Sequence, residues 1–316
     1  SAFPVPHGKP ALGRKASQRH GSAAEREELT LELTNLKTIR ELLDRHGFTF
    51  SKALGQNFLI NPSVCPRMAQ ECGADAQTGV LEVGPGIGVL TVELAARAKK
   101  VVSVELDDRL LPVLRETLAE HPNASVVHGD ILKLDLHELI AREFCGMDVA
   151  VCANLPYYIT SPVIMRFLEE RLPIRALTVM GQKEAADRIC ALPGQRAAGA
   201  LSLAVRYYAR PEILFQVSRG SFLPAPNVDS TVIRLNVLSQ PPVSVDSEQT
   251  FFALVRASFG QRRKTLCNAV SAGMGIPKET LSALLTAAEI PPQARAEQLS
   301  LEQFAHLSNE ISKQKG

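Results

Sequence analysis

The chain has 316 residues, of which 45% are hydrophobic and 22% are charged, and its formal net charge is only +2. These values are typical of a globular protein with room for one large and one smaller domain, and they confine any nucleic-acid surface to a local patch. No run of about 18 apolar residues is present, so we predict no membrane span. The six cysteines form no Cys-x-x-Cys pair, which argues against metal sites and disulfides and favours reduced core thiols in a cytoplasmic protein.

Residues 1–34 are predicted to be a basic, disordered N-terminal extension. The first 24 residues hold Lys9, Arg14, Lys15 and Arg19, several glycines and prolines, and no acidic residue. Such a composition buries too little apolar surface to offset the entropy of ordering. Contact with RNA phosphates and service as an organellar transit peptide stay open as alternatives, although the segment is short and has no obvious apolar face.

The middle of the chain has the pattern of an α/β domain. Apolar residues at helical spacing over 36–43 predict a short helix that ends at Gly47. Five short apolar runs follow at helix-length intervals, which predicts a parallel sheet covered on both faces. These runs are 80–83, 101–105, 125–128, 149–153 and 176–180. Two later runs, 213–217 and 231–235, are too close together for a helical crossover, so we expect them to form an antiparallel pair at one edge.

The last part of the chain is predicted to be helical. A linker rich in proline and serine covers 239–247, and two apolar stripes at helical spacing follow it. The stripes are Leu281, Leu284, Leu285 and Ala288, and Leu301, Phe304, Leu307 and Ile311. We therefore predict a catalytic α/β domain over 35–238 and a smaller all-helical domain over 239–316.

A glycine loop is the first functional signal. Gly84, Gly86 and Gly88 stand at alternate positions between the first predicted strand and a helix, where glycine permits a sharp turn and close approach of a ligand to the backbone. Dinucleotide sites place the third glycine one residue later, as G-x-G-x-x-G, to bring a pyrophosphate to the helix N-terminus. The spacing here, with Glu82 two residues ahead, suits S-adenosylmethionine, whose sulfonium is positive and which carries no phosphate.

Acidic residues end the next two predicted strands. Glu105 lies 21 residues after Gly84, and an acid at that place can accept hydrogen bonds from both ribose hydroxyls. Asp130 can accept from the adenine amino group while Ile131 packs on the ring. Either acid alone is as readily a solvated cap of a strand. Two acids at the ends of the two strands that follow the glycine loop together indicate a cofactor pocket at the carboxyl ends of the first three strands.

The fourth predicted strand ends in a motif suited to an exocyclic amine. The lone pair of such an amine is delocalised into its ring, so methylation needs acceptors aimed at the two N–H groups. The Asn154 side-chain oxygen and the Leu155 carbonyl are the predicted acceptors, because Pro156 stiffens the turn and keeps Leu155 extended. Tyr157 then offers a flat face on which a base stacks. A rigid turn with a buried tyrosine is the alternative for such a motif in isolation.

With these motifs the chain resembles the bacterial small-subunit (16S) ribosomal RNA adenine N6-dimethyltransferase family over residues 35–316. Eight motifs in the family's order carry the resemblance: 55–59, 84–88, 105–107, 129–130, 154–157, 182–184, 222–230 and 262–266. One position departs from the pattern, because Ala198 stands where the family usually has a tyrosine. That departure puts the contacts of its loop in question but not the reaction.

The resemblance implies a Rossmann-like, seven-stranded methyltransferase sheet that binds S-adenosylmethionine. It implies dimethylation of the N6 amines of adjacent adenines in a 3'-terminal hairpin of small-subunit rRNA, with the immature small ribosomal subunit as partner. Gln56, Asn57 and Leu59 resemble the family's early cofactor-contacting motif, and Asn154 is expected to serve both cofactor and substrate. Phe222 matches the aromatic residue expected to stack on the flipped adenine. A monomer is the default expectation.

Three consecutive cations, Arg262, Arg263 and Lys264, precede the helical stripes. Such a run is usually a solvated helix face, but beside the methyltransferase motifs we expect it to bind RNA phosphates without reading sequence. A non-catalytic RNA-binding assembly factor and a large-subunit rRNA adenine methyltransferase are the alternative functions. A nicotinamide oxidoreductase is disfavoured by the glycine spacing.

Overall fold

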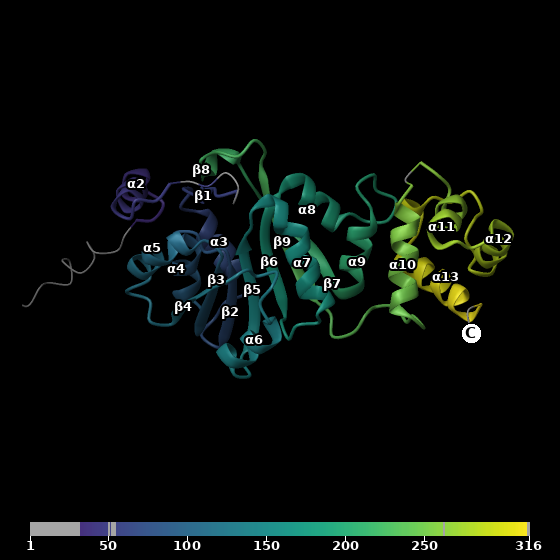
Figure 1. The fold of residues 1–316 in the computed structure, drawn as a ribbon, viewed down its shortest axis with the longest axis horizontal. Coiled ribbons are helices and arrows are strands. Elements are labelled where there is room, and N and C mark those ends of the chain that lie inside the picture. The colour runs from purple at the N-terminus through teal and green to yellow at the C-terminus, as the bar shows by residue number, and fades with distance from the viewer. Residues whose placement is uncertain (1–31, 50, 52–54, 262, 315–316) are drawn as a thin grey trace, which may run out of the picture. The chain divides into compact units, whose positions relative to one another are not determined.

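Seven strands form one sheet in a computed structural model that describes residues 32–49, 51, 55–261 and 263–314 (Figure 1). Their order is β4-β3-β2-β5-β6-β9-β7. The bounds are β2 (Thr78–Val83), β3 (Lys100–Glu105), β4 (Ala124–His128), β5 (Asp148–Asn154), β6 (Ala176–Gln182), β7 (Ala209–Val217) and β9 (Ser230–Val237). The first five are parallel, and β9 pairs antiparallel with both β6 and β7. The predicted parallel sheet and its antiparallel edge pair are confirmed.

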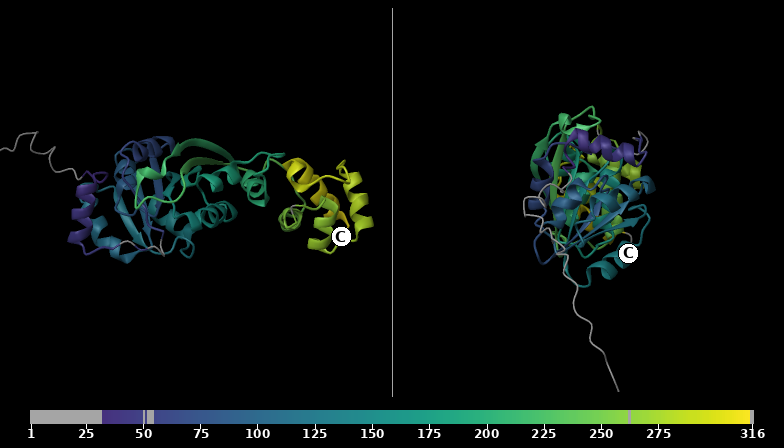
Figure 2. Two further views of the ribbon diagram at one scale, coloured as in Figure 1. Left: turned by 90° about the horizontal axis from the view of Figure 1, so that it is seen from above. Right: turned by 90° about the vertical axis from the view of Figure 1, so that its left-hand side faces the viewer.

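Helices cover both faces of the sheet because successive residues of a strand point to opposite sides. In β2, Val80 packs with residues of α3 (Val64–Glu71) and α4 (Val89–Ala95). Its neighbour Leu81 packs with residues of α6 (Leu136–Phe144) and α7 (Thr160–Glu169). All six residues of β2 are buried, which is expected for a central parallel strand. Figure 2 shows the ribbon from two further sides.

The chain reverses its direction across the sheet between β2 and β5. From β2 it moves outward through β3 to β4, and it then returns to place β5 and β6 on the other side of β2. Crossover connections therefore leave the carboxyl ends of β2 and β5 toward opposite faces. Open α/β sheets have their ligand crevice at such a switch point, so the topology predicts where the site lies.

A second, two-stranded sheet joins segments that are far apart in the sequence. Strand β1 (Phe58–Leu59) pairs antiparallel with β8 (Phe222–Leu223), with Leu59 opposite Phe222. The N-terminal helix α2 (Leu36–Arg45) packs with α5 (Leu111–Thr117). Its N-cap Asn35 accepts hydrogen bonds from two backbone N–H groups of the first turn, and Gly47 lies two residues after its end. The predicted helix over 36–43 is confirmed.

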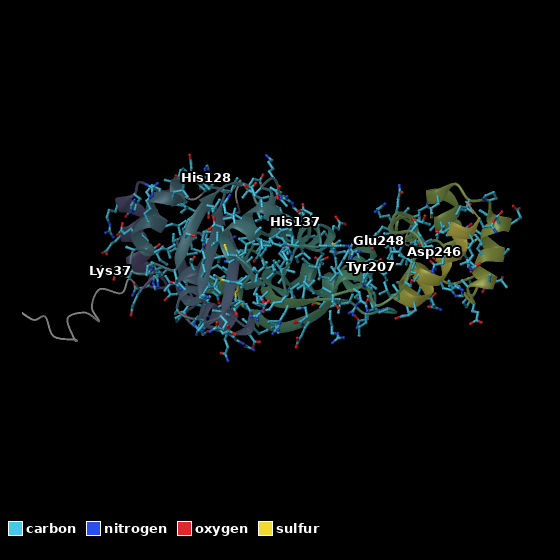
Figure 3. The ribbon with its side chains drawn as sticks, turned by 90° about the horizontal axis from the view of Figure 1, so that it is seen from below. Lys37, His128, His137, Tyr207, Asp246 and Glu248 are labelled. Carbon is cyan, nitrogen blue, oxygen red and sulfur yellow. The ribbon has the colours of Figure 1, made fainter. Side chains whose placement is uncertain are left out.

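The remaining helices follow the sheet. They are α8 (Lys183–Cys190), α9 (Ala200–Tyr208), α10 (Glu248–Phe259), α11 (Leu266–Met274), α12 (Lys278–Ala287) and α13 (Leu301–Lys313), with short 3-10 turns η1 (Asp108–Leu110), η2 (Tyr157–Ile159), η3 (Arg219–Ser221) and η4 (Ala296–Gln298). Both predicted apolar stripes are buried. Tyr207 of α9 packs against Phe251 of α10, and its hydroxyl donates to Glu248 Oε1 at 2.8 Å (Figure 3). The division of the chain at residues 238 and 239 stays a prediction.

Two predictions concern the N-terminal extension and the absence of a membrane span. The N-terminal extension predicted over residues 1–34 lies outside the described residues as far as residue 31. In the part that is described, no helix combines the length and apolar character needed to cross a membrane.

All six cysteines are free. Cys65, Cys72 and Cys152 are buried, whereas Cys145 is exposed, so the expectation of core thiols is wrong for Cys145.

Candidate active site

A cavity of about 260 Å³ opens at the carboxyl ends of β2, β3, β4 and β5, where the chain reverses direction across the sheet. Thirteen of the predicted site residues line it. They are Gln56, Asn57, Leu59, Gly84, Gly86, Glu105, Asp130, Ile131, Asn154, Leu155, Pro156, Tyr157 and Phe222. Residues from six separated stretches of sequence thus meet in one pocket, as expected for a site at the topological switch point.

The glycine loop forms the floor of this pocket. Gly84, Gly86 and Gly88 all have positive φ, so each occupies backbone space that other residues rarely adopt. A Cβ on Gly86 would lie 3.4 Å from the Phe58 ring, inside the pocket wall. Gly88 does not line the cavity: it precedes α4, and a Cβ there would meet the Thr117 hydroxyl at 3.0 Å. Gly88 therefore serves helix packing here, and its predicted cofactor contact stays a prediction.

Glu105 is held with its carboxylate at the pocket. The backbone N–H of Asp107 donates to Oε1 at 2.8 Å, and that of Gly86 donates to Oε2 at 3.3 Å. Burial raises the pKa of Glu105, while these two N–H groups favour the ionised form. Each oxygen has a second lone pair, so the carboxylate can accept from two ligand hydroxyls at once.

Asp130 lies at the pocket and also stabilises its own turn. Its Oδ1 accepts from the backbone N–H of Leu132 at 3.0 Å, and its Oδ2 lies 3.5 Å from Lys133 Nζ. The neighbouring Ile131 is buried and lines the cavity. The capping role considered for Asp130 is therefore present, and it leaves lone pairs on both oxygens for a ligand.

Glu82 is a pocket residue that the sequence brought out only as a neighbour of the glycine loop. It is fully buried at the end of β2, where Thr91 and Ser103 each donate a hydroxyl to its Oε2 at 2.6 Å. Its Oε1 is buried and has no hydrogen-bond partner among the described residues. Burial raises the pKa of Glu82 to about 7. A buried acid with an unsatisfied oxygen lowers its energy when a cationic group enters the pocket.

The pocket therefore fits S-adenosylmethionine, the cofactor that the glycine spacing predicted. Glu82 would face the positive sulfonium of the cofactor, Glu105 would accept hydrogen bonds from its ribose hydroxyls, and Ile131 and Leu106 would pack against its adenine. Leu106, like Tyr158, was not selected from the sequence, although both line the cavity while about half exposed. The available signal was a large apolar side chain directly after the end of β3 for Leu106, and a second tyrosine beside Tyr157 for Tyr158.

The Asn154 turn lies beside these groups at the end of β5. The Leu155 N–H donates to the Met180 carbonyl at 3.3 Å, which fixes the turn to β6. Among the described residues, neither the Asn154 side chain nor the Leu155 carbonyl takes part in a hydrogen bond. Pro156 has ψ 136°, and Tyr157 follows in η2. Two acceptors at the pocket are thus left for a ligand with N–H groups.

Two aromatic residues line the same cavity. The Tyr157 hydroxyl lies 2.9 Å from Ser230 Oγ, at the buried start of β9. Phe222 is buried in β8, where its pairing with Leu59 brings it to the pocket. Ala198, at the position where the resemblance leads us to expect a tyrosine, is buried and does not line the cavity. The two rings are in place to bound a planar base.

The predicted RNA-binding cations lie apart from this cavity. Arg263 and Lys264 are exposed in the turn between α10 and α11, and neither forms an ion pair with the residues that the structure describes. Arg262 lies outside the described residues. The segment is a turn and not the solvated helix face considered from the sequence, because Thr265 caps α11 only after it. Among the described residues, no group of three or more His, Cys, Asp or Glu side chains is placed to bind a metal ion.

A parallel sheet with a glycine loop, a buried acid at the end of β3 and an Asn-Leu-Pro-Tyr turn at the end of β5, all at its switch point, is the arrangement of a Rossmann-like methyltransferase. The comparisons with known proteins name its family. The family model described as "Ribosomal RNA adenine dimethylase" matches residues 47–313. The chain therefore belongs to the ribosomal RNA adenine dimethylase family. The predictions of the family, the fold class and an S-adenosylmethionine-dependent enzyme are confirmed.

Individual relatives agree with this assignment. The chain is 49% identical over 276 residues to ribosomal RNA small subunit methyltransferase A of Geobacillus sp. (strain WCH70), covering 86% of this chain and 95% of that protein. It is 47% identical over 282 residues to the protein of that name from Alkaliphilus oremlandii (strain OhILAs), covering 89% and 98%. The crystal structure of a dimethyladenosine transferase from Plasmodium falciparum matches with TM-score 0.71 and 26% identity, covering 82% and 98%. That of the 23S rRNA methyltransferase ErmE matches with TM-score 0.64 and 28% identity, covering 81% and 100%.

Proposed function

We propose that the protein dimethylates the N6 amines of adjacent adenines in a 3'-terminal hairpin of small-subunit rRNA during ribosome biogenesis. The observation that carries this proposal is the pair of unengaged acceptors, Asn154 and Leu155, beside a pocket that fits S-adenosylmethionine. The two relatives with the small-subunit name are 49% and 47% identical to this chain, whereas the 23S rRNA methyltransferase ErmE is 28% identical. The higher identity to relatives with the small-subunit name supports small-subunit over large-subunit rRNA as the substrate.

The cofactor supplies an electrophilic methyl group, and the chain's own residues prepare the amine to accept it. One N6–H of the adenine donates to the Asn154 side-chain oxygen and the other to the Leu155 carbonyl. These bonds turn the nitrogen lone pair away from the ring, and they strengthen as positive charge develops on nitrogen during transfer. The nitrogen then loses a proton that its positive charge has made acidic, so no strong general base is needed.

The two aromatic residues hold the base during transfer. Tyr157 stacks on the adenine, and its hydroxyl contact with Ser230 at 2.9 Å restrains the ring. Phe222 bounds the base from β8. The adenine has to leave its stack to enter the pocket, at a cost of roughly a few kcal/mol. Selection among adenines then depends on recognition of folded RNA in an immature small subunit, which fits a monomeric enzyme of the cytoplasm.

Transfer of labelled methyl groups to small-subunit particles that lack the modification tests this function. Digestion of the product to nucleosides should yield N6,N6-dimethyladenosine. Asn154→Ala should lower kcat by about 10²–10³-fold, because an acceptor that acts in the transition state is lost. Its binding of RNA should be unchanged. Asn236→Ala, in β9 and without a side-chain hydrogen bond in the described structure, is the matched control and should transfer normally. Wild-type protein that binds particles but transfers no label would establish the assembly factor instead.

The basic turn is the proposed phosphate contact. Arg263→Glu together with Lys264→Glu should weaken RNA binding and lower the slope of log affinity against log salt by about 2, because each cation releases about one counterion. Lys99→Glu, an exposed charge just before the amino end of β3, is the control and should change the slope little. An unchanged slope in the double variant would contradict this role.

A further inference from the structure

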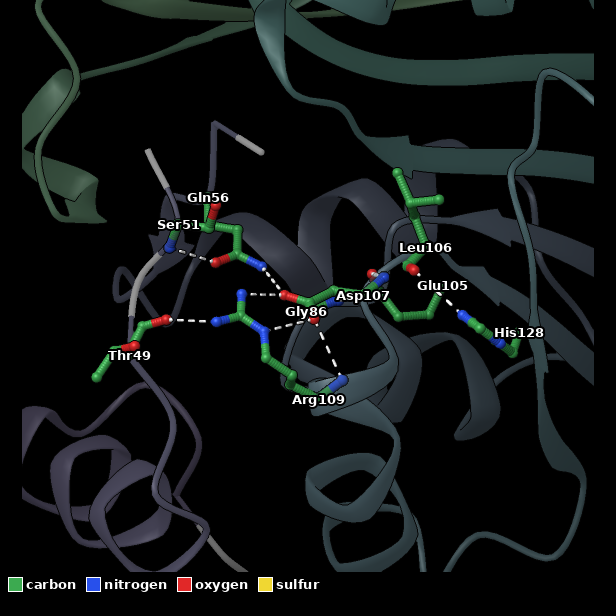
Figure 4. A network of polar contacts seen from close by, with 9 residues as sticks. All are labelled: Thr49, Ser51, Gln56, Gly86, Glu105, Leu106, Asp107, Arg109 and His128. Carbon is green, nitrogen blue, oxygen red and sulfur yellow. Dashed lines mark hydrogen bonds and ion pairs between the residues drawn. The ribbon is translucent and has the colours of Figure 1, made fainter. Parts of the chain in front are cut away.

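The Asp107 carboxylate is a junction between two walls of the pocket (Figure 4). Its Oδ2 accepts from Gln56 Nε2 and from Arg109 Nη2, both at 2.7 Å. Its Oδ1 accepts from Arg109 Nε at 2.8 Å and from the Arg109 backbone N–H at 3.2 Å. The side chain is only 5% exposed. All four lone pairs of the carboxylate are thus engaged within the protein.

On one side, Asp107 contacts Glu105, the acid expected to bind the ribose hydroxyls of the cofactor. The backbone N–H of Asp107 donates to Glu105 Oε1 at 2.8 Å, so the position of Asp107 sets the rotamer of Glu105. The other Glu105 oxygen accepts from the Gly86 N–H. A shift of the Asp107 backbone would therefore turn the Glu105 carboxylate away from the glycine loop.

The other side is the segment that precedes β1. Gln56 donates to Asp107 and accepts from the Ser51 N–H at 3.0 Å, and Gln56 itself lines the cavity. Arg109 reaches the same segment, since its Nη1 donates to the Thr49 carbonyl at 3.4 Å and its guanidinium lies 5.0 Å from the centre of the Phe48 ring. These contacts fix Phe48, Thr49 and Gln56 to the end of β3.

We propose that Asp107 is a positioning residue. It holds Gln56 and Glu105, which both line the cofactor pocket, in fixed positions, so that the pocket is preformed before the cofactor binds. The inference rests on the proposed use of this pocket. Asp107 itself does not line the cavity, so it acts through its two neighbours. A carboxylate suits the task because it accepts from a guanidinium and an amide together, and charge-assisted bonds are stronger than neutral ones. Hydrogen bonds from Arg109 and Gln56 also lower the pKa of Asp107, which keeps it ionised.

Calorimetric titration of Asp107→Asn with S-adenosylmethionine and with S-adenosylhomocysteine tests the proposal. We expect the Kd of both ligands to rise about tenfold, since both carry the ribose that Glu105 faces and a charge-assisted bond is lost. The KM for S-adenosylmethionine should rise with Kd, while kcat at saturation stays near the wild-type value. Asp108→Asn, the same change at an exposed neighbour, is the control and should leave Kd unchanged.

A reversed pair separates positioning from general loss of structure. Gln56→Glu places two carboxylates in contact and should raise Kd at least as much as Asp107→Asn. Adding Asp107→Asn to Gln56→Glu rebuilds an amide–carboxylate pair in the opposite sense and should return Kd part of the way to wild type. The proposal is overturned if Asp107→Asn binds both ligands like wild type, or if the double variant binds no more tightly than Gln56→Glu. A wild-type protein that binds neither ligand would instead overturn the proposed function together with this inference.

Discussion

Glu82 gives the protein a pH-dependent stability that one substitution should remove. The carboxyl group is fully buried, and burial raises its pKa from 4.5 to about 7. The folded protein therefore keeps this proton at pH values where the unfolded chain has lost it. This group costs no stability below pH 4.5, lowers the stability as the pH rises from about 4.5 to about 7, where the folded state binds more protons than the unfolded chain, and has a constant effect above that range.

The magnitude follows from the two pKa values. A tenfold difference in acidity corresponds to about 1.36 kcal/mol, so this group alone should lower the free energy of unfolding by about 2–3 kcal/mol between pH 5 and pH 8. Glu82→Gln has no proton to lose. Its amide oxygen still accepts from Thr91 and Ser103, which bond to Oε2 in the wild type. The variant should therefore gain about 2–3 kcal/mol relative to wild type over that pH range.

Urea unfolding of the cofactor-free protein at pH 5 and pH 8 measures this difference. Glu120→Gln, an exposed acid on the surface, is the matched control and should track the wild type at both pH values. The reasoning fails if the difference in unfolding free energy between Glu82→Gln and wild type is the same at pH 5 and pH 8. In that case the buried carboxyl group would be ionised in the folded protein throughout.

Two further predictions concern the aromatic wall and the sheet. Ser230→Ala should raise the KM for RNA several-fold without changing the Kd of S-adenosylmethionine, because the Tyr157 hydroxyl loses its 2.9 Å partner. Ser230→Thr keeps a hydroxyl at this position and should restore the wild-type KM. A change in the Kd of the cofactor would contradict a role confined to the base. Gly79→Ala should destabilise the protein by about 1–3 kcal/mol in urea unfolding, because its Cβ would lie 2.4 Å from the buried Phe144 ring. Gly199→Ala meets nothing within 4 Å and should change stability by less than about 0.5 kcal/mol, so equal effects at the two glycines would refute the steric argument.

The sequence by itself determined the strands of the parallel sheet, the end of the sheet at which the pocket lies and the identity of most pocket residues. Short apolar runs at helix-length intervals encode parallel strands, and residues that directly follow such strands must gather at one edge of the sheet. Glu105, Asp130 and Asn154 meet at one cavity for this reason. The local periodicity also located α12 and α13, since burial of an apolar stripe follows from spacing alone.

Only the tertiary structure decided which distant segments complete the site. Phe222 reaches the pocket through pairing with Leu59, more than 160 residues earlier, and a two-residue strand leaves no periodic signal. The bond from Gln56 to Asp107 is equally non-local, because nothing in either motif specifies the other as its partner. Such contacts form once the sheet has fixed the ends of both segments, so they depend on packing and loop closure, which a single sequence does not display.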